Sequence, residues 1–385
     1  MVVRSCEVIQ VNIWVIGRNY PEKFNKMCGS FELEQAKTLE KYGQNVSYIT
    51  CVFHPLYKVK KWGFCEWEED VSVFAYSQFY VPQRCCIYWD SFKRKRWEEL
   101  LKHVEDKMGI PDVIHVHYPT LITIPETILA YKKSGCKIIV TEHWTKVQKQ
   151  ILNRHEREQL LKYLVDADEV ICVGNPLKES ILQLYGKKRR IQVIPNMVPE
   201  LFGGSADRHN GFHFIAVGRL VSVKQFKEII EVFCQTFMNE KEVQLVIVGG
   251  GSEYRRLSRL IKKYNMEDQV ILTGAKSREE TSMYMKNADV LICFSRLETF
   301  GVPVIEAWYT GLPVIATEAL GFLSYWRKNL GILVSSQDTQ ELKSAMLELR
   351  KNYASYDKEQ IQNYAKAHFS GQALYQSLMA LYTKC

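Results

Sequence analysis

The feature that most constrains the fold of this chain is a regular alternation of short apolar runs with longer amphipathic stretches along its 385 residues. Short apolar runs are typical of buried strands, and apolar positions three or four residues apart are typical of helices packed against them. Alternation of the two predicts an α/β fold in which parallel sheets are wound with helices. The expected strands are Val8–Ile16, Val46–Cys51, Val113–Val116, Lys137–Thr141, Glu169–Val173, Ile191–Ile194, Phe212–Val217, Val243–Val248, Val270–Thr273, Val290–Phe294, Pro313–Ala316 and Gly331–Val334. The expected helices include Glu32–Tyr42, Trp97–Met108, Phe226–Phe237, Tyr254–Tyr264 and Gln340–Lys351.

The pattern divides into two halves at a segment rich in turn-forming residues. Residues 199–211 contain three glycines and a proline, which is typical of a linker. An Ala-Asp step before an apolar strand occurs in both halves, in Val165–Cys172 and in Lys286–Cys293. We therefore expect two Rossmann-like, doubly wound domains, 1–198 and 212–365, that face each other across a shared ligand cleft.

Composition and charge exclude several classes of protein. With 46% hydrophobic and 24% charged residues, the chain is close to the globular average. Its 11 cysteines are odd in number and show no C-x-x-C spacing, which argues against a disulfide framework or a zinc site and favours buried thiols in a reducing compartment. Gln10 and Asn12 interrupt the first apolar run, which therefore resembles a strand rather than a signal peptide. No run approaches the ~18 apolar residues of a membrane-spanning helix.

The most informative segment follows the predicted strand Val290–Phe294. Pro303 suits the first turn of a helix, and Gly301 removes side-chain bulk just before it. The backbone amides of Phe300, Gly301 and Val302 would then lie at a helix N-terminus, where unpaired donors form an anion site. This segment predicts a phosphate-binding turn.

Two glutamates flank that turn. Glu298 precedes the predicted helix and Glu306 lies about one turn inside it. Carboxylates beside an anion site suit a ligand that carries hydroxyl groups next to its phosphates, because they accept hydrogen bonds from sugar hydroxyls. An ordinary turn with solvated acids is the alternative, and it would be preferred if the two glutamates stood alone.

A second motif ends the strand that opens the second half. Gly218 and Arg219 follow this strand, and Lys224 lies just before the next helix. Two cations at the carboxyl end of a strand are well placed to bind a diphosphate. The net charge of 51 − 43 = +8 is consistent with an anionic ligand.

Several other motifs are absent. There is no G-x-x-x-x-G-K-[ST] sequence, which argues against a P-loop NTPase, and no G-x-G-x-x-G follows the first strand, which argues against a nicotinamide dehydrogenase. Asp166 and Asp168 precede a strand and are better explained as a helix-to-strand turn than as metal ligands. We expect neither a metal ion nor a cofactor, and the lack of a nucleic-acid-binding module argues against nucleic acid as a partner.

Together these motifs resemble a known family. Gly218-Arg219-(x4)-Lys224 followed by Glu298-(x7)-Glu306 is similar to the retaining nucleotide-sugar glycosyltransferases of the GT-B fold, family 4, also called glycosyl transferases group 1. The resemblance extends over nearly the whole chain. In the first half it is carried by Asn19–Pro21, Cys28–Phe31, Asp112–Pro119, Val140–Trp144 and Ile194–Val198.

The resemblance implies a hexosyltransferase-type enzyme and a role for each matching residue. Catalysis would involve Glu298, Arg219, Lys224 and His117, with His117 reaching the donor sugar from the other domain. The donor would be bound by Gly29, Gly218, Arg219, Lys224, Phe300, Gly301, Val302 and Glu306, where Arg219 and Lys224 bind the diphosphate and Glu306 the ribose. His143 would contact the sugar or acceptor, or serve as a structural hydrogen-bond donor.

The chain also departs from the family pattern. Members usually carry Lys-Gly where this chain has Lys224-Gln225, and usually a Gly-Gly pair with Glu where it has Ala319–Tyr325. The change at Ala319–Tyr325 falls where the family contacts the sugar or the acceptor, so it leaves open which sugar the donor carries. The last helix of the family crosses back to the first domain, and Phe369–Tyr382, within 366–385, has the leucine spacing to do so.

The acceptor is the least determined part of the hypothesis. Lys58–Phe64 and Phe92–Trp97 interleave cations with aromatic residues, and apolar positions follow the second segment at helical spacing. This pattern fits a membrane-surface helix and fits equally a core-facing helix with a solvated basic end. We expect a cytoplasmic enzyme, peripheral on the inner face of the membrane in the first case, with a lipid-linked or oligosaccharide acceptor of surface polysaccharide synthesis. A sugar-nucleotide epimerase or a noncatalytic sugar-nucleotide-binding protein is the alternative.

Overall fold

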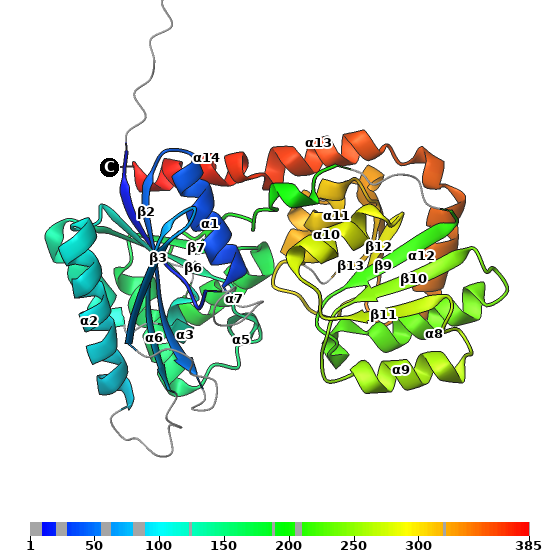
Figure 1. Cartoon of the computed structure of the whole chain (residues 1–385), viewed down its shortest axis with the longest axis horizontal. Coiled ribbons are helices and arrows are strands. Elements are labelled where there is room, and N and C mark those ends of the chain that lie inside the picture. Colours follow the sequence, from blue (N-terminus) through cyan, green and yellow to red (C-terminus); the bar gives the residue numbers. More distant parts are fainter. Residues whose placement is uncertain are drawn as a thin grey trace, which may run out of the picture. The chain divides into compact units, whose positions relative to one another are not determined.

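The computed structural model describes residues 10–20, 29–54, 63–79, 89–122, 125–186, 189–204, 210–318 and 321–384 (Figure 1). The chain divides into two compact units. The first consists of Met1–Ile194 with Leu374–Cys385, and the second of Pro195–Ala373.

The first unit contains an eight-stranded sheet in the order β3-β4-β2-β1-β5-β6-β7-β8. All neighbouring strands are parallel except β3, which runs antiparallel to β4 at one edge. The strands are β1 Asn12–Ile16, β2 Asn45–His54, β3 Gly63–Glu68, β4 Ser72–Phe79, β5 Val113–His117, β6 Lys137–Glu142, β7 Glu169–Cys172 and β8 Gln192–Val193. The antiparallel edge pair was not expected from the sequence. The exposure of β3 explains this, because its side chains are buried only at Cys65.

Helices cover both faces of this sheet. They are α1 Ser30–Lys41, α2 Trp89–Met108, α3 Pro119–Ile122, α4 Pro125–Leu129, α5 Thr145–Gln148, α6 Arg154–Asp166, α7 Asn175–Tyr185 and α14 Gly371–Tyr382, with a 3-10 helix, η3, at Ala130–Ser134. His115 on β5 contacts Gln35 of α1 and Tyr382 of α14 on one face. Trp14 on β1 packs against Tyr131 of η3 on the other face.

The second unit contains a six-stranded, wholly parallel sheet in the order β11-β10-β9-β12-β13-β14. Its strands are β9 Phe212–Val217, β10 Val243–Val248, β11 Val270–Gly274, β12 Val290–Cys293, β13 Val314–Thr317 and β14 Gly331–Val334. Its helices are α8 Phe226–Phe237, α9 Tyr254–Lys263, α10 Arg278–Lys286, α11 Val302–Thr310, α12 Thr339–Lys351 and α13 Lys358–Phe369. Helices α8 and α9 lie along one face of the sheet and α10 and α11 along the other (Figure 1). The two wound sheets expected from the sequence are confirmed.

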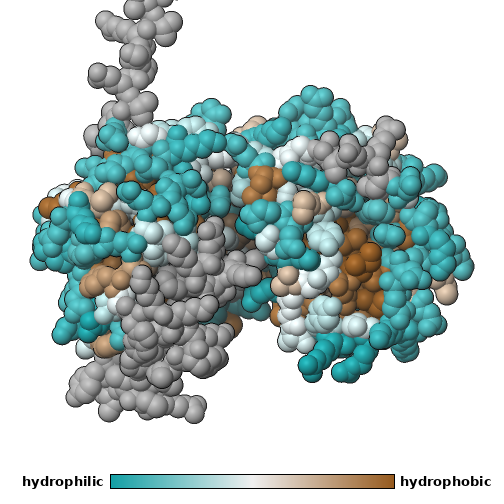
Figure 2. All heavy atoms as spheres, in the orientation of Figure 1, coloured by the Kyte–Doolittle hydropathy of each residue, from teal (hydrophilic) through white to brown (hydrophobic). Residues whose placement is uncertain are grey.

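The core of the second unit is continuous and strongly apolar. Residues from β9, β10, α8 and α12 pack together, and several, including Phe214, Phe233 and Leu245, are fully buried. The surface view shows an apolar area over β10 and β11 (Figure 2), and Ile271 on the edge strand β11 is 40% exposed. No helix in the described part of the chain is long and apolar enough to cross a membrane.

Candidate functional site

The second sheet has a topological switch point between β9 and β12. The chain winds from β9 through β10 to β11 on one side and from β12 through β13 to β14 on the other. The loops at the carboxyl ends of β9 and β12 therefore lead in opposite directions, and open α/β sheets bind ligands at such a point. The loop after β9 carries Gly218, Arg219 and Lys224, and the loop after β12 carries Glu298. The fold thus brings together two motifs that sequence analysis singled out separately.

Lys224 and Glu298, 74 residues apart in the chain, form an ion pair at this point. Their side chains are only 16% and 14% exposed. The hydroxyl of Ser295 also donates a hydrogen bond to Glu298 Oε1, at 3.2 Å. The Lys224 ammonium and the Glu298 carboxylate, which we expect to bind a ligand, therefore hold each other in place.

Arg219 differs from Lys224 because its side chain is exposed. Among the residues that the structure describes, no hydrogen bond or ion pair to the Arg219 guanidinium is found. Its loop is nevertheless fixed by backbone hydrogen bonds, from Leu220 N to Gly250 O at 2.9 Å and from Glu253 N to Leu220 O at 3.0 Å. Arg219 is thus a cation on a rigid loop, available to a ligand.

Helix α11 begins as the sequence predicts. Gly301 is its N-cap with φ of 99°, a left-handed conformation that favours glycine, and Pro303 lies in the first turn. The amides of Phe300, Gly301 and Val302 donate to no other residue in the described ranges. They form a set of donors at the positive end of the helix dipole.

Glu306 lies on α11, is 5% exposed, and is paired with Arg278 of α10. Arg278 Nη2 donates to Glu306 Oε1 at 2.7 Å. Burial raises the pKa of the Glu306 carboxyl, and the guanidinium acts in the opposite direction. Sequence analysis did not identify Arg278. The sequence around it signals only a helix start, through the capping box of Ser277 and Glu280.

Gln225 is a second residue whose role the sequence did not reveal. It has φ of 54°, which is left-handed and explains why glycine suits this position in the family. Its buried side chain donates from Nε2 to the carbonyl of Phe294 at 2.6 Å and accepts from Arg296 Nε at 2.9 Å. These bonds tie the loop of Lys224 to the loop after β12 and offset the backbone strain.

The first sheet has its own switch point, between β1 and β5. Arg18 follows β1 and is paired with Glu32 of α1 at 2.7 Å, while His117 ends β5. Gly29 is the N-cap of α1 with φ of 91°. A Cβ at Gly29 would overlap the carbonyl oxygen of Asn19, so the backbone itself requires glycine there. Pro21–Cys28, which carry part of the family resemblance, lie outside the described residues.

His117 belongs to a cluster of aromatic rings. Its ring lies face to face with His115, with ring centres 4.5 Å apart. Its Nδ1 is 2.9 Å from Nε2 of His143, the residue that follows β6. The ring of Tyr118 stacks on His143 at 4.6 Å, and the Arg18 guanidinium lies 3.5 Å from the centre of the Tyr118 ring.

Burial determines the charge state of this cluster. Desolvation lowers the pKa of His115, His117 and His143 well below the ordinary histidine value, and neighbouring charges add to the effect. All three imidazoles are therefore neutral at pH 7. Glu142, whose carboxylate accepts hydrogen bonds from the amides of His143 and Trp144, has its pKa raised to about 7 by burial.

Helix α2 carries the second of the two basic segments. The apolar side chains after this segment, Leu100, Leu101 and Val104, are buried in the first unit, so their helical spacing reflects core packing. Arg96 folds back, donating to Tyr76 Oη at 3.0 Å and pairing with Glu99. The other basic segment lies outside the described residues except for Gly63 and Phe64.

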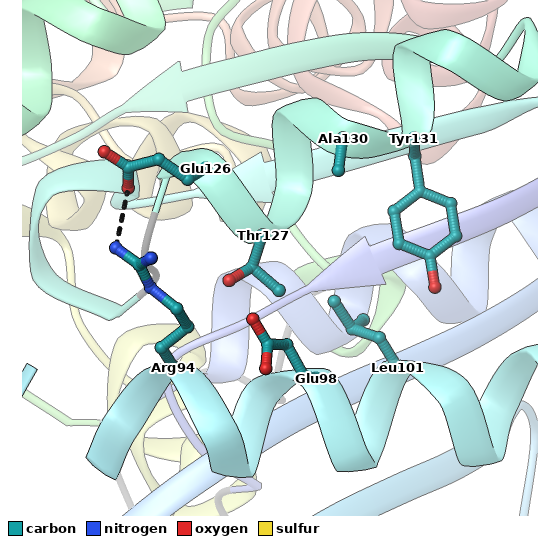
Figure 3. Close-up of a pocket in the computed structure, with 7 residues that line it drawn as sticks. All are labelled: Arg94, Glu98, Leu101, Glu126, Thr127, Ala130 and Tyr131. Atoms are coloured by element: carbon teal, nitrogen blue, oxygen red, sulfur yellow. Dashed lines mark ion pairs between the residues drawn. The ribbon is translucent and has the colours of Figure 1, made fainter. Parts of the chain in front are cut away.

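A cavity of about 250 Å³ opens between α2, α4 and η3 (Figure 3). Arg94 and Glu98 of α2 face Glu126 and Thr127 of α4, and the closest approach of Arg94 to Glu126 is 3.9 Å. The Thr127 hydroxyl is buried, and no hydrogen-bond partner for it is found in the described part of the chain. Within the described ranges no three His, Cys, Asp or Glu side chains are grouped to hold a metal ion.

Asp166 and Asp168 lie in the turn between helix α6 and strand β7. Helix α6 ends at Asp166, and Asp168 accepts hydrogen bonds from the amide of Ile138 and from Lys132, both at 2.8 Å. This matches their interpretation as a helix-to-strand turn.

Two family models match the chain. Residues 33–200 match Glycosyltransferase Family 4, and residues 198–368 match Glycosyl transferases group 1. A curated relative, N-acetyl-alpha-D-glucosaminyl L-malate synthase of Bacillus anthracis, is 23% identical over 258 residues, which cover 63% of this chain and 66% of that protein. The first curated relatives are matched over only part of their own lengths, 66%, 59% and 47%.

Solved structures resemble the chain over almost its full length. Sucrose-phosphate synthase from Thermosynechococcus elongatus superposes with a TM-score of 0.76 and 21% identity, covering 96% of this chain and 98% of that one. The Anabaena protein HepE in complex with UDP superposes with a TM-score of 0.71 and 15% identity, covering 96% and 99%. At these identities the likeness establishes the two-sheet GT-B fold.

Proposed function

Because the chain belongs to the family 4 glycosyltransferases of the GT-B fold, we propose that it transfers a sugar from a nucleotide-sugar donor to an acceptor, with retention of the anomeric configuration. One observation carries the proposal. The cations of Arg219 and Lys224, the carboxylate of Glu298 and the amides that open α11 all lie at the switch point of the second sheet. A nucleoside diphosphate sugar needs this combination of charges.

The donor diphosphate is assigned to Arg219, Lys224 and the amides of residues 300–302. As the bond between the anomeric carbon and the phosphate oxygen breaks, negative charge builds on the leaving diphosphate. Positioned donors stabilise this charge at no cost of reorganisation. Lys224 is also paired with Glu298, so its ammonium can bridge the sugar-binding acid and the phosphate.

The remaining assignments follow the chemistry of the donor. Glu306 accepts hydrogen bonds from the ribose hydroxyls, and its partner Arg278 keeps it ionised for that role. Glu298 and His117 contact the transferred sugar. The acceptor hydroxyl attacks the anomeric carbon from the side that the phosphate leaves, and its proton passes to the departing phosphate oxygen. One C–O bond forms as the other breaks, and no external acid or base is required.

Two assays test the reaction and separate it from epimerase and binding functions. Thermal unfolding with UDP, GDP, ADP and their sugars identifies the nucleotide, since a ligand at 100 times its dissociation constant adds about 2.7 kcal/mol of stability. Mass spectrometry of the products with a saccharide acceptor then distinguishes transfer from epimerisation. The UDP complex of the HepE structure makes UDP-sugars the first to test. Absence of stabilisation by every nucleotide would refute the proposed donor site.

The acceptor is proposed to be a lipid-linked saccharide or an oligosaccharide bound by the first unit. Arg94 and Lys95 in the basic segment of α2 are exposed, and Arg94 also lines the cavity of Figure 3. Such charge attracts anionic lipid headgroups in a salt-dependent way. Flotation with vesicles of phosphatidylglycerol and phosphatidylcholine at low and high salt tests this. Recovery of the protein only in the unbound fraction at low salt would remove the membrane part of the proposal.

A further inference from the structure

The cluster around His117 supports an inference about His143, which rests on the proposed role of His117 at the donor sugar. We propose that His143 is a positioning residue that fixes which ring nitrogen of His117 carries the proton. His143 would then act through His117, without contacting the sugar or the acceptor itself.

The first observation is the direct contact between the two rings. His117 Nδ1 and His143 Nε2 are 2.9 Å apart, and both rings are neutral because burial disfavours their charged forms. A neutral imidazole has one N–H and one lone pair. One ring must donate and the other accept, so the two tautomers are coupled: either both rings carry their proton on Nε2, or both carry it on Nδ1.

The second observation is the other nitrogen of His117. His117 is 2% exposed, and its Nε2 is buried with no hydrogen-bond partner among the residues that the structure describes. A buried polar atom left unpaired is rare in native proteins and requires an explanation. A ligand that pairs with this nitrogen provides one. The tautomer then matters, because it decides whether Nε2 donates to the ligand or accepts from it.

The third observation is that neighbouring groups hold both rings in place. His115 covers one face of His117, and His115 is itself fixed by Tyr382 Oη at 2.5 Å and Thr141 Oγ1 at 2.6 Å. Tyr118 stacks on His143, and Arg18 lies over Tyr118. His117 and His143 are therefore held by packing, and their mutual hydrogen bond makes the tautomer of His117 depend on the tautomer of His143.

Three variants separate positioning from simple structural support. His143→Phe keeps an aromatic ring against Tyr118 but removes the hydrogen bond. His143→Gln places an amide nitrogen near the position of Nε2 and can restore it. His115→Phe is the matched control, because it also replaces a buried ring of the cluster while leaving the bond between His117 and His143 intact.

The first readout is the nitrogen NMR spectrum of the ligand-free protein labelled with ¹⁵N-histidine, in which the two tautomers have distinct patterns. We expect His117 and His143 to show the same tautomer, and His143→Phe to change the pattern of His117 while His115→Phe preserves it. Opposite tautomers on the two rings, or a His117 pattern unchanged in His143→Phe, would overturn the proposal. This readout needs no substrate, so it stands apart from the test of the transferase reaction.

The second readout is kinetic. At metal sites, removing the hydrogen-bond partner that orients a ligating histidine costs about 10- to 100-fold in activity, and we take this range as the scale for His117. We expect a fall of this size in kcat for His143→Phe, with recovery of most of it in His143→Gln and little change in KM for the donor. Equal activity of the Phe and Gln variants, or a loss confined to KM, would show that His143 does not act through the hydrogen bond.

Discussion

Replacement of Arg278 by Met tests the buried ion pair that holds Glu306. In the native protein the guanidinium donates to Glu306 Oε1 at 2.7 Å, and the two side chains are 17% and 7% exposed. Met keeps most of the apolar packing of the Arg278 stem beside Phe202, whose ring centre is 5.3 Å from the guanidinium carbon. The substitution therefore removes mainly the charge, and it leaves a buried carboxylate without its cation.

The expected loss of unfolding free energy follows from how deeply Arg278 and Glu306 are buried. Removing one partner of a fully buried ion pair costs about 3–5 kcal/mol. Because Arg278 keeps some contact with water, which screens the interaction, we expect a loss of about 2–4 kcal/mol of unfolding free energy at pH 8. This is a large fraction of the stability of a typical domain.

The loss should depend on pH in a predictable direction. Burial already raises the Glu306 pKa and Arg278 opposes this, so the pKa is higher still in the variant. The pKa of a glutamate in the unfolded chain is about 4.3. When the pKa is higher in the folded protein, the unfolded state loses the proton more readily, so the folded state becomes less stable as the pH rises above about 4.3. The stability difference between the two proteins should therefore be largest at pH 8 and shrink towards pH 5.

Urea unfolding followed by tryptophan fluorescence measures this, since Trp308 and Trp326 report on the second unit. Arg278→Met combined with Glu306→Gln should recover more than half of the loss, because no charge is left buried. Arg256→Met is the surface control: its ion pair with Glu253 is 64% exposed on the arginine side, and the cost should be below about 1 kcal/mol. A loss below ~0.5 kcal/mol for Arg278→Met at pH 8, or one that does not change with pH, would refute the reasoning.

Three further changes have definite expected outcomes. Arg219→Ala should lower initial transfer rates by about 10²–10³-fold with an unchanged melting temperature, because one preorganised donor to the leaving group is lost; a parental rate would remove Arg219 from the donor site. Gln225→Ala should lose more unfolding free energy than Gln225→Gly, by about 1 kcal/mol, because both lose the side-chain bonds but only glycine relieves the left-handed backbone; equal losses in urea titrations would contradict this. Tyr382→Phe should lower the unfolding free energy by about 0.5–1.5 kcal/mol through loss of its bond to His115, and an unchanged urea midpoint would show that this bond contributes nothing.

The accuracy with which strands could be predicted depends on how apolar and uninterrupted their sequences are. The strands β9, β10 and β14 have the bounds expected from the sequence, because each is a mostly apolar run that ends at a turn. The edge strand β3 mixes exposed, intermediate and buried positions, and the apolar run of its partner β4 is short and flanked by polar residues. Helix α2 begins at Trp89 rather than Trp97 for a related reason, since its first turns are basic and carry little apolar periodicity.

Some features of the site could likewise be predicted from neighbouring residues in the chain, whereas others depend on the tertiary structure. The anion-binding turn of α11 depends on neighbours in the chain, so Gly301 and Pro303 suffice to predict it. The pairing of His117 with His143 depends instead on the parallel register of β5 and β6, which places His117 opposite Thr141, two residues before His143. Local sequence can mark both histidines as strand-end residues but cannot supply that register. The strand order decides where each switch point lies, and it cannot be predicted from local sequence either. It is this order that brings motifs far apart in the chain to the same end of the sheet.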